Sequence, residues 1–282
     1  MASEISRILR FEPYRACRNP VIILAWVFGL LYFALLTLYL GRLAEPIAEV
    51  ARQIGSPGDQ NMQALLIALL DWATDGLALK LLTNRPPVLG MFFIFAIVGT
   101  PWIAMLVAAD QLASDIGRRH IRFLLPRASR RGLYLARALG AWLTWVVLLA
   151  VCVPVIGLIL GALDPDTTVA GGFFYSLRVL LVLAVYGLPW VALMAVVNTF
   201  VAQAFLAYML ATGIWMVVAM IAFAFSLMNE SYAAVAWLLP AGTKYALLSA
   251  EWSHVLGAGG LLLLYTAAYL AIGDWIIRRR DL

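Results

Sequence analysis

The chain of 282 residues is 64% hydrophobic and only 12% charged, with a formal net charge of +5. Soluble domains are roughly 45–50% apolar and about 25% charged, so a water-soluble fold could not bury this much apolar surface. The two cysteines, Cys17 and Cys152, exclude a disulfide framework. The two histidines, His120 and His254, have no cysteine or carboxylate cluster at ligand spacing, so we expect no metal site.

The first apolar run covers residues 21–40 and follows a basic N-terminal segment. It is longer than the ~7–15 residues of a signal-peptide core, so we interpret it as a retained span. Five further runs without a charged residue follow, at 91–109, 138–162, 179–197, 205–228 and 255–273. About 20 apolar residues cross ~30 Å of hydrocarbon as a helix, and lipid requires that the backbone satisfies its own hydrogen bonds.

The sequence therefore predicts an all-α, polytopic membrane protein with one transmembrane domain over residues 1–282. The predicted order is a cytoplasmic amphipathic segment (1–20), span 1 (21–43), an external helical loop (44–87), span 2 (88–113), a cytoplasmic loop (114–131), span 3 (132–162), span 4 (173–198), span 5 (205–228), an external segment (229–253) and span 6 (254–277).

Arginine sets the predicted orientation, because most arginines gather on one side of the six spans. They precede span 1, follow span 2 and follow span 6: Arg7, Arg10, Arg15 and Arg18; Arg118, Arg119, Arg122, Arg127, Arg130, Arg131 and Arg137; Arg278, Arg279 and Arg280. The positive-inside rule then places both termini in the cytoplasm.

The first external loop contains a competing apolar stretch at residues 61–82. Asp71 and Asp75 lie four residues apart near its middle, on one helical face. A seventh crossing here would export the largest arginine cluster. We therefore predict an amphipathic helix on the outer membrane surface, separated from the first part of the loop by an SPGD turn at 56–59.

The loop between spans 2 and 3 reads ASDIGRRHIRFLLPRASR from residue 113. As a helix it would carry arginines on one side and Ile121, Leu124 and Leu125 on the other. Such a helix can lie among the headgroups or dock a partner. The alternative is a basic loop solvated among anionic lipids.

This loop resembles the segment that links spans 2 and 3 in type-2 ATP-binding-cassette exporter permeases, including those of multidrug export, sodium export and nitrous-oxide-reductase maturation. FEPYRACRNP (11–20) resembles the family's N-terminal segment, WLLPAGTKYALL (237–248) its last outer loop, and WIIRRRDL (275–282) its C-terminus. The family's Gly-Thr pair falls on Arg119 and His120, and its proline is displaced to Pro126.

The resemblance implies a permease subunit of an exporter in the bacterial inner membrane, with an unidentified substrate and short re-entrant helices before span 6. No Gly-Lys pair occurs in the chain, so ATP and Mg would be bound by a separate ATPase, and this chain would need no cofactor. The implied partners are two cytoplasmic ATPase subunits, a second permease copy or relative, and membrane lipid, but no nucleic acid. The implied ATPase-coupling residues are Asp115, Arg118, Arg119, His120, Arg122, Leu124, Leu125, Arg127 and Arg131. The implied N-terminal interface residues are Glu12 and Arg18.

Two other functions are compatible with these sequence features. An ion-coupled secondary transporter would need charged groups near the midplane, whereas Asp110 and Asp274 approach the spans only near their ends, where we expect pairing with arginines. A membrane subunit that transmits ATPase motion without moving a substrate has the same sequence features as an exporter. A membrane-embedded enzyme is not predicted, because the spans hold no paired carboxylates, histidines or activated nucleophile.

Overall fold

The computed structural model describes residues 9, 11–12, 14–46, 86–117, 129–164, 167–228, 239–249 and 251–279. Within these ranges every element of secondary structure is a helix. In chain order they are α2 (Pro20–Arg42), α6 (Pro87–Val107), α7 (Ala113–Gly117), α9 (Arg130–Leu163), α10 (Val169–Val197), α11 (Ala204–Met228), the 3₁₀ helix η2 (Pro240–Thr243), α12 (Lys244–Leu248) and α13 (Trp252–Arg279).

Among the described residues, six helices are long and apolar enough to cross a membrane. They are α2, α6, α9, α10, the Ala204–Ile221 part of α11, and α13. This confirms the predicted all-α, polytopic class. The predicted external helix at 61–82 and the SPGD turn lie outside the described residues, as do residues 229–238 of the predicted external segment.

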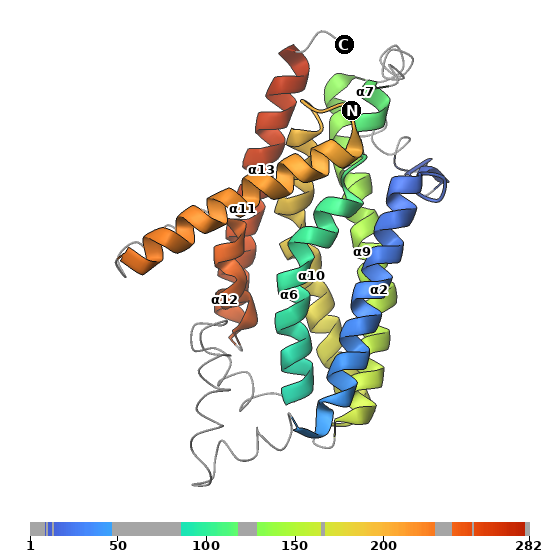
Figure 1. Ribbon diagram of the computed structural model, residues 1–282, viewed down its shortest axis with the longest axis vertical. Helices are drawn as coiled ribbons and strands as arrows, with labels where there is room; N and C mark the ends of the chain where they lie inside the picture. The colour runs from blue at the N-terminus through green and yellow to red at the C-terminus, as the bar shows by residue number, and fades with distance from the viewer. Residues whose placement is uncertain are drawn as a thin grey trace.

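The starts of α2 and α9 and the end of α13 lie at the same end of the bundle, the upper end in Figure 1. We call it the arginine-rich end. Its described arginines are Arg15, Arg18, Arg130, Arg131, Arg137, Arg278 and Arg279. The ends of α2 and α9 and the start of α13 lie at the opposite end (Figure 1).

Helix α10 is the centre of the bundle and packs against α9, α13, α6 and α11. Glycines allow the closest approach, because a Cβ on Gly157 of α9 would stand 2.7 Å from the carbonyl oxygen of Gly172 in α10. Membrane helices associate through such small residues, which let two backbones come together. Farther along, the indole of Trp145 lies against Gly187 and donates to the carbonyl of Leu183 over 3.3 Å.

Local signals define where the long helices begin. Asn19 caps α2 by accepting from the N–H of Val21, and Pro20 follows at the first position, where its missing N–H costs nothing. Ser129 and Thr168 cap α9 and α10 in the same way. Prolines occur inside α6, α9 and α10, at Pro101, Pro154 and Pro189.

Helix α11 crosses the other long helices obliquely in Figure 1, and its far part extends beyond the bundle. An aromatic cluster attaches it. The ring of Trp215 stands edge-on to Trp102 of α6 at 4.8 Å and to Trp190 of α10 at 5.6 Å between centroids. These three tryptophans therefore pack between helices.

At the opposite end, η2 and α12 pack against α13. Arg178 of α10 fastens this region, because its guanidinium donates to the carbonyl of Ser249 over 2.9 Å and stacks on the Trp252 ring at 4.6 Å. The guanidinium thus holds the start of α13 to α10.

Candidate functional site

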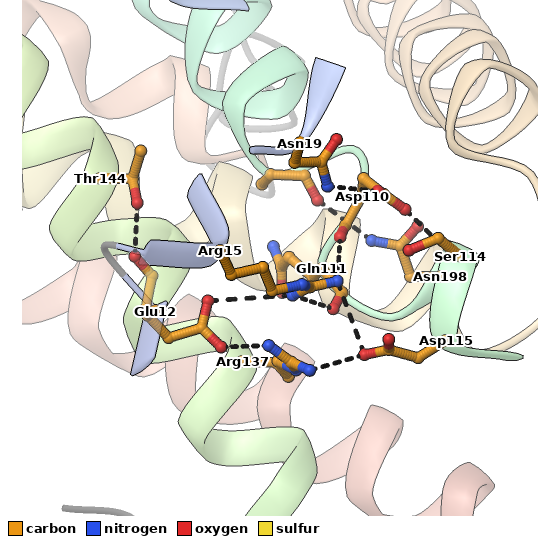
Figure 2. A network of polar contacts seen from close by, with 12 residues as sticks. Glu12, Arg15, Asn19, Asp110, Gln111, Ser114, Asp115, Arg137, Thr144 and Asn198 are labelled. Atoms are coloured by element: carbon orange, nitrogen blue, oxygen red, sulfur yellow. Dashed lines mark hydrogen bonds and ion pairs between the residues drawn. The ribbon is translucent and has the colours of Figure 1, made fainter. Parts of the chain in front are cut away.

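An ionic network at the arginine-rich end joins three parts of the chain that are far apart in sequence (Figure 2). Glu12 comes from the segment before α2, Asp115 from α7, and Arg137 from the first turns of α9. Nη2 of Arg137 lies 2.8 Å from Oδ2 of Asp115, and its Nη1 donates to Oε1 of Glu12. Arg15 completes the network, at 3.5 Å from Asp115 and 3.8 Å from Glu12. Two carboxylates and two guanidinium groups thus form a quartet that is neutral overall.

The quartet is largely removed from solvent. The side chains of Glu12, Asp115 and Arg137 keep only 10–11% of their exposure. Gly140 makes room for Glu12, since a Cβ there would stand 2.7 Å from Cγ of Glu12. Burial lowers the pKa of the Arg15 guanidinium, and the charge of Arg137 lowers it further, whereas Asp115 and Glu12 raise it. An arginine stays protonated at physiological pH, so the acids compensate a charge that burial disfavours.

The junction between α6 and α7 is held by a second layer of hydrogen bonds, which continues the quartet. Arg15 donates to the backbone carbonyls of Asp110 and Gln111 over 3.0 and 3.1 Å. The carboxylate of Asp110 accepts from Asn19 over 2.5 Å and from the N–H of Ser114 over 2.9 Å. Among the described residues, Asp110 therefore bonds an amide and caps α7, and its charge also raises the pKa of the nearby Arg15 guanidinium.

The same junction is tied to the central helix. Nε2 of Gln111 donates to the carbonyl of Val191 in α10, and Nδ2 of Asn198, at the end of α10, donates to the carbonyl of Ala108 after α6. Both bonds are 3.1 Å long. Gln111 and Asn198 are fully or almost fully buried, so these bonds connect backbones inside the bundle. Segment 11–19, α7, α9 and α10 are thus connected through side chains at one place.

The residues named from the sequence are not all in this network. Glu12 and Asp115 are part of it. Arg18 is exposed and stacks on the ring of Tyr14 at 4.2 Å instead. Arg131 pairs with Asp274 of α13 at 3.6 Å. Arg118, Arg119, His120, Arg122, Leu124, Leu125 and Arg127 lie outside the described residues.

Sequence reasoning missed the role of Arg15, Arg137 and Asn19. Arg15 could have been found, because it follows Glu12 by three residues and therefore shares its helical face. Arg137 gave no such signal, because several arginines near the start of α9 are equivalent by spacing. The expected pairing of Asp274 with arginines is confirmed, since it contacts Arg131 and Arg278.

An open groove of about 660 Å³ lies between α2 and α9, away from the quartet. Its wall is apolar, with Phe33 and Leu38 from α2 facing Val155 and Ile159 from α9, and Arg42 lies at its edge. The hydroxyl of Thr37 is turned away into a bond with the Phe33 carbonyl, 2.7 Å long. The groove therefore offers apolar surface rather than hydrogen-bonding groups.

These features define an all-α, multi-pass membrane protein with a buried ionic network at one end of its helix bundle. Comparison of the chain with protein-family models and with curated proteins found no match.

Proposed function

We propose that the chain is the transmembrane permease subunit of an ATP-binding-cassette exporter. It moves an unidentified substrate across the bacterial inner membrane, using ATP that a separate ATPase subunit hydrolyses. Six apolar helices and charge-free span cores support a transport protein. The arginine clusters support a cytoplasmic location for both chain ends and for segment 114–131.

The quartet is the observation that carries the proposal. Segment 114–131, which the family resemblance marks as the ATPase-coupling element, begins in α7, where Asp115 contacts Arg137 of α9 and Arg15 of the N-terminal segment. A force applied to this loop would therefore be passed to the bundle through short charged contacts. A coupling element needs this property, because a loop attached only by its chain ends would absorb the force.

The partners follow from the proposed function. Two ATPase subunits bind ATP and Mg and dock on segment 114–131 and the N-terminal segment. A second permease copy, or a relative, forms the other half of the pathway, with η2 and α12 as re-entrant helices at the outer end. The uncharged spans support an apolar, amphipathic or sugar-like substrate over a bare ion.

The location of the charges argues against an ion-coupled transporter. Such transporters use charged groups or broken helices near the midplane. The ion pairs at the described spans and the N-terminal segment lie toward helix ends, with Glu12, Asp115 and Arg137 at the start of α9 and Asp274 near the end of α13. A subunit that only transmits ATPase motion remains the second candidate, because the same quartet would serve it.

The test is purification of the tagged chain from its native membranes, with ATP hydrolysis and bound subunits as the readout. We expect a nucleotide-binding subunit to co-purify and to be lost when Arg118, Arg119 and Arg122 are changed to glutamate. The matched control changes Arg42, Arg52 and Arg85, on the predicted outer side, to glutamate and should retain the partner. A wild-type chain that purifies without ATP-hydrolysing activity, and whose transport follows an ion gradient, contradicts the proposal.

A further inference from the structure

A groove of about 360 Å³ runs between the start of α9 and the end of α13, at the arginine-rich end. Its floor is apolar and is formed by Leu135, Leu270 and Ala271. Its rim is charged and is formed by Arg131, Asp274 and Arg278. Hydrocarbon surface and guanidinium groups therefore meet along one short groove, which is a different place from the Glu12–Arg137 quartet.

Among the residues that the structure describes, the rim carries more positive than negative charge. Asp274 contacts both Arg131, at 3.6 Å, and Arg278, as a close pair. Arg130 donates to the carbonyl of Arg278 over 3.4 Å, and Arg279 stacks on the Trp275 ring at 4.2 Å. Among the described residues, this part of α9 and α13 thus has one carboxylate and four arginines, and Arg131 and Arg278 contact that carboxylate.

The two guanidinium groups of the rim remain accessible. The side chains of Arg131 and Arg278 keep 52% and 53% of their exposure, whereas Asp274 keeps only 14%. A guanidinium has five N–H donors, and Asp274 uses only part of them. The remaining donors point to an anion that would bind at the mouth of the groove.

We propose that this groove binds an anionic phospholipid of the inner leaflet. Its phosphate lies between Arg131 and Arg278, and one acyl chain lies on the floor formed by Leu135, Leu270 and Ala271. Basic pockets between transmembrane helices on the cytoplasmic side bind anionic headgroups. Trp275 at the groove is a residue type that anchors helices at the membrane interface.

The apolar floor is the reason to choose a lipid over a free phosphate. A free anion would be held by the rim alone and would leave the floor against water or detergent. A phospholipid covers rim and floor together, because its charge and its hydrocarbon are joined in one molecule. The proposal goes beyond the export function and also gives Arg131 a role apart from ATPase docking.

The experiment uses the purified full-length chain in neutral detergent and counts bound lipid by native mass spectrometry. Dioleoyl phosphatidylglycerol should bind roughly 25-fold more tightly than dioleoyl phosphatidylcholine, since two arginines are each worth about a fivefold factor. Millimolar inorganic phosphate should not displace it. Equal affinity for the two lipids overturns the proposal, and displacement by free phosphate overturns the assignment to a lipid.

Variants then locate the site. Arg278→Gln should weaken phosphatidylglycerol binding about fivefold, whereas Arg42→Gln, which removes an interfacial arginine at the other end of the bundle, should leave it unchanged. Asp274→Asn removes the competing carboxylate and should tighten phosphatidylglycerol binding. A variant that damaged the fold would instead weaken binding. Weaker binding in Asp274→Asn at an unchanged melting temperature overturns the proposal, as does equal loss in the two arginine variants.

Ala271→Phe provides an independent readout that leaves every charge in place. Ala271 is exposed on α13, so the larger side chain is tolerated while it fills the floor of the groove. We expect at least a fivefold loss of phosphatidylglycerol binding at an unchanged melting temperature. Full binding in this variant would show that the arginines bind lipid without help from the apolar floor. That result would contradict the proposed site.

Discussion

Removal of Arg137 should detach the N-terminal segment from the bundle. In Arg137→Gln, Glu12 and Asp115 share the single positive charge of Arg15, and the quartet carries a net negative charge while about nine-tenths buried. Removal of one partner from a buried ion pair costs about 3–5 kcal/mol, because the remaining charge has lost its compensation. The lost free energy should destabilise the contact between the N-terminal segment and the start of α9, since Arg137 joins these two parts directly.

The assay is hydrogen–deuterium exchange of the purified chain in micelles, followed at the amides of residues 14–19. A loss of about 3 kcal/mol raises the population of the detached segment, and hence the exchange rate of its amides, by roughly a hundredfold. Exchange at the buried contact of α9 with α10 should stay the same, which provides the internal control.

A second substitution tests whether charge is the cause. Glu12→Gln combined with Arg137→Gln restores a neutral site. The free-energy cost of detaching the segment in this double variant should therefore be smaller than the sum of the costs in the two single variants, by a coupling energy of about 1–3 kcal/mol. Arg137→Lys should rescue only in part, because an ammonium group cannot span two carboxylates as a guanidinium does. Exchange in Arg137→Gln within threefold of the wild type would refute the reasoning, and so would strictly additive effects.

Three further outcomes are expected. Gly187→Ala should lower the unfolding free energy in detergent by about 1–3 kcal/mol, because its Cβ would stand 2.2 Å from Nε1 of Trp145, whereas Gly213→Ala, with nothing within 4 Å, should not. Arg178→Met should cost about 2 kcal/mol and speed amide exchange around Ser249, and unchanged exchange there would contradict its bridging role. In a Cys152→Ala background, an impermeant maleimide should label the exposed Cys17 in inverted vesicles and not in spheroplasts, and the reverse pattern would invert the orientation.

The membrane class was predictable from the sequence because hydropathy is a local property. A run such as 21–40 predicts a membrane span whichever helices it packs against. Helix α2, at Pro20–Arg42, begins at an Asn-Pro pair, which favours a helix start. The central position of α10 was not predictable. Its composition resembles that of the peripheral helices, and its burial depends on glycines such as Gly157 and Gly172, whose partners lie on another helix.

The ionic network was predictable only in part. The family resemblance pointed to Glu12 and Asp115, and both lie in it. It also pointed to Arg18, whereas the arginine one turn after Glu12 is Arg15. The pairing of Glu12 with Arg137 spans 125 residues of sequence and depends on the space that Gly140 leaves, so no local pattern indicates it.

The central helix α10 is bonded to the same end of the bundle as the ionic network. Two buried bonds from the α6–α7 junction, Gln111 to Val191 and Asn198 to Ala108, attach α10 at the same end where the quartet attaches the N-terminal segment and α9. A displacement of α7 is therefore shared by α9 and α10, whose own contact is closed by Gly157 and Gly172. If the chain acts as we propose, we expect these joined helices to move together. The share of buried residues is 17% in the α11 span against 67% in the α10 span, so we expect relative motion at the contact of α11. This favours rocking of a block formed by α9 and α10 against α11 over bending of a single helix within the bundle.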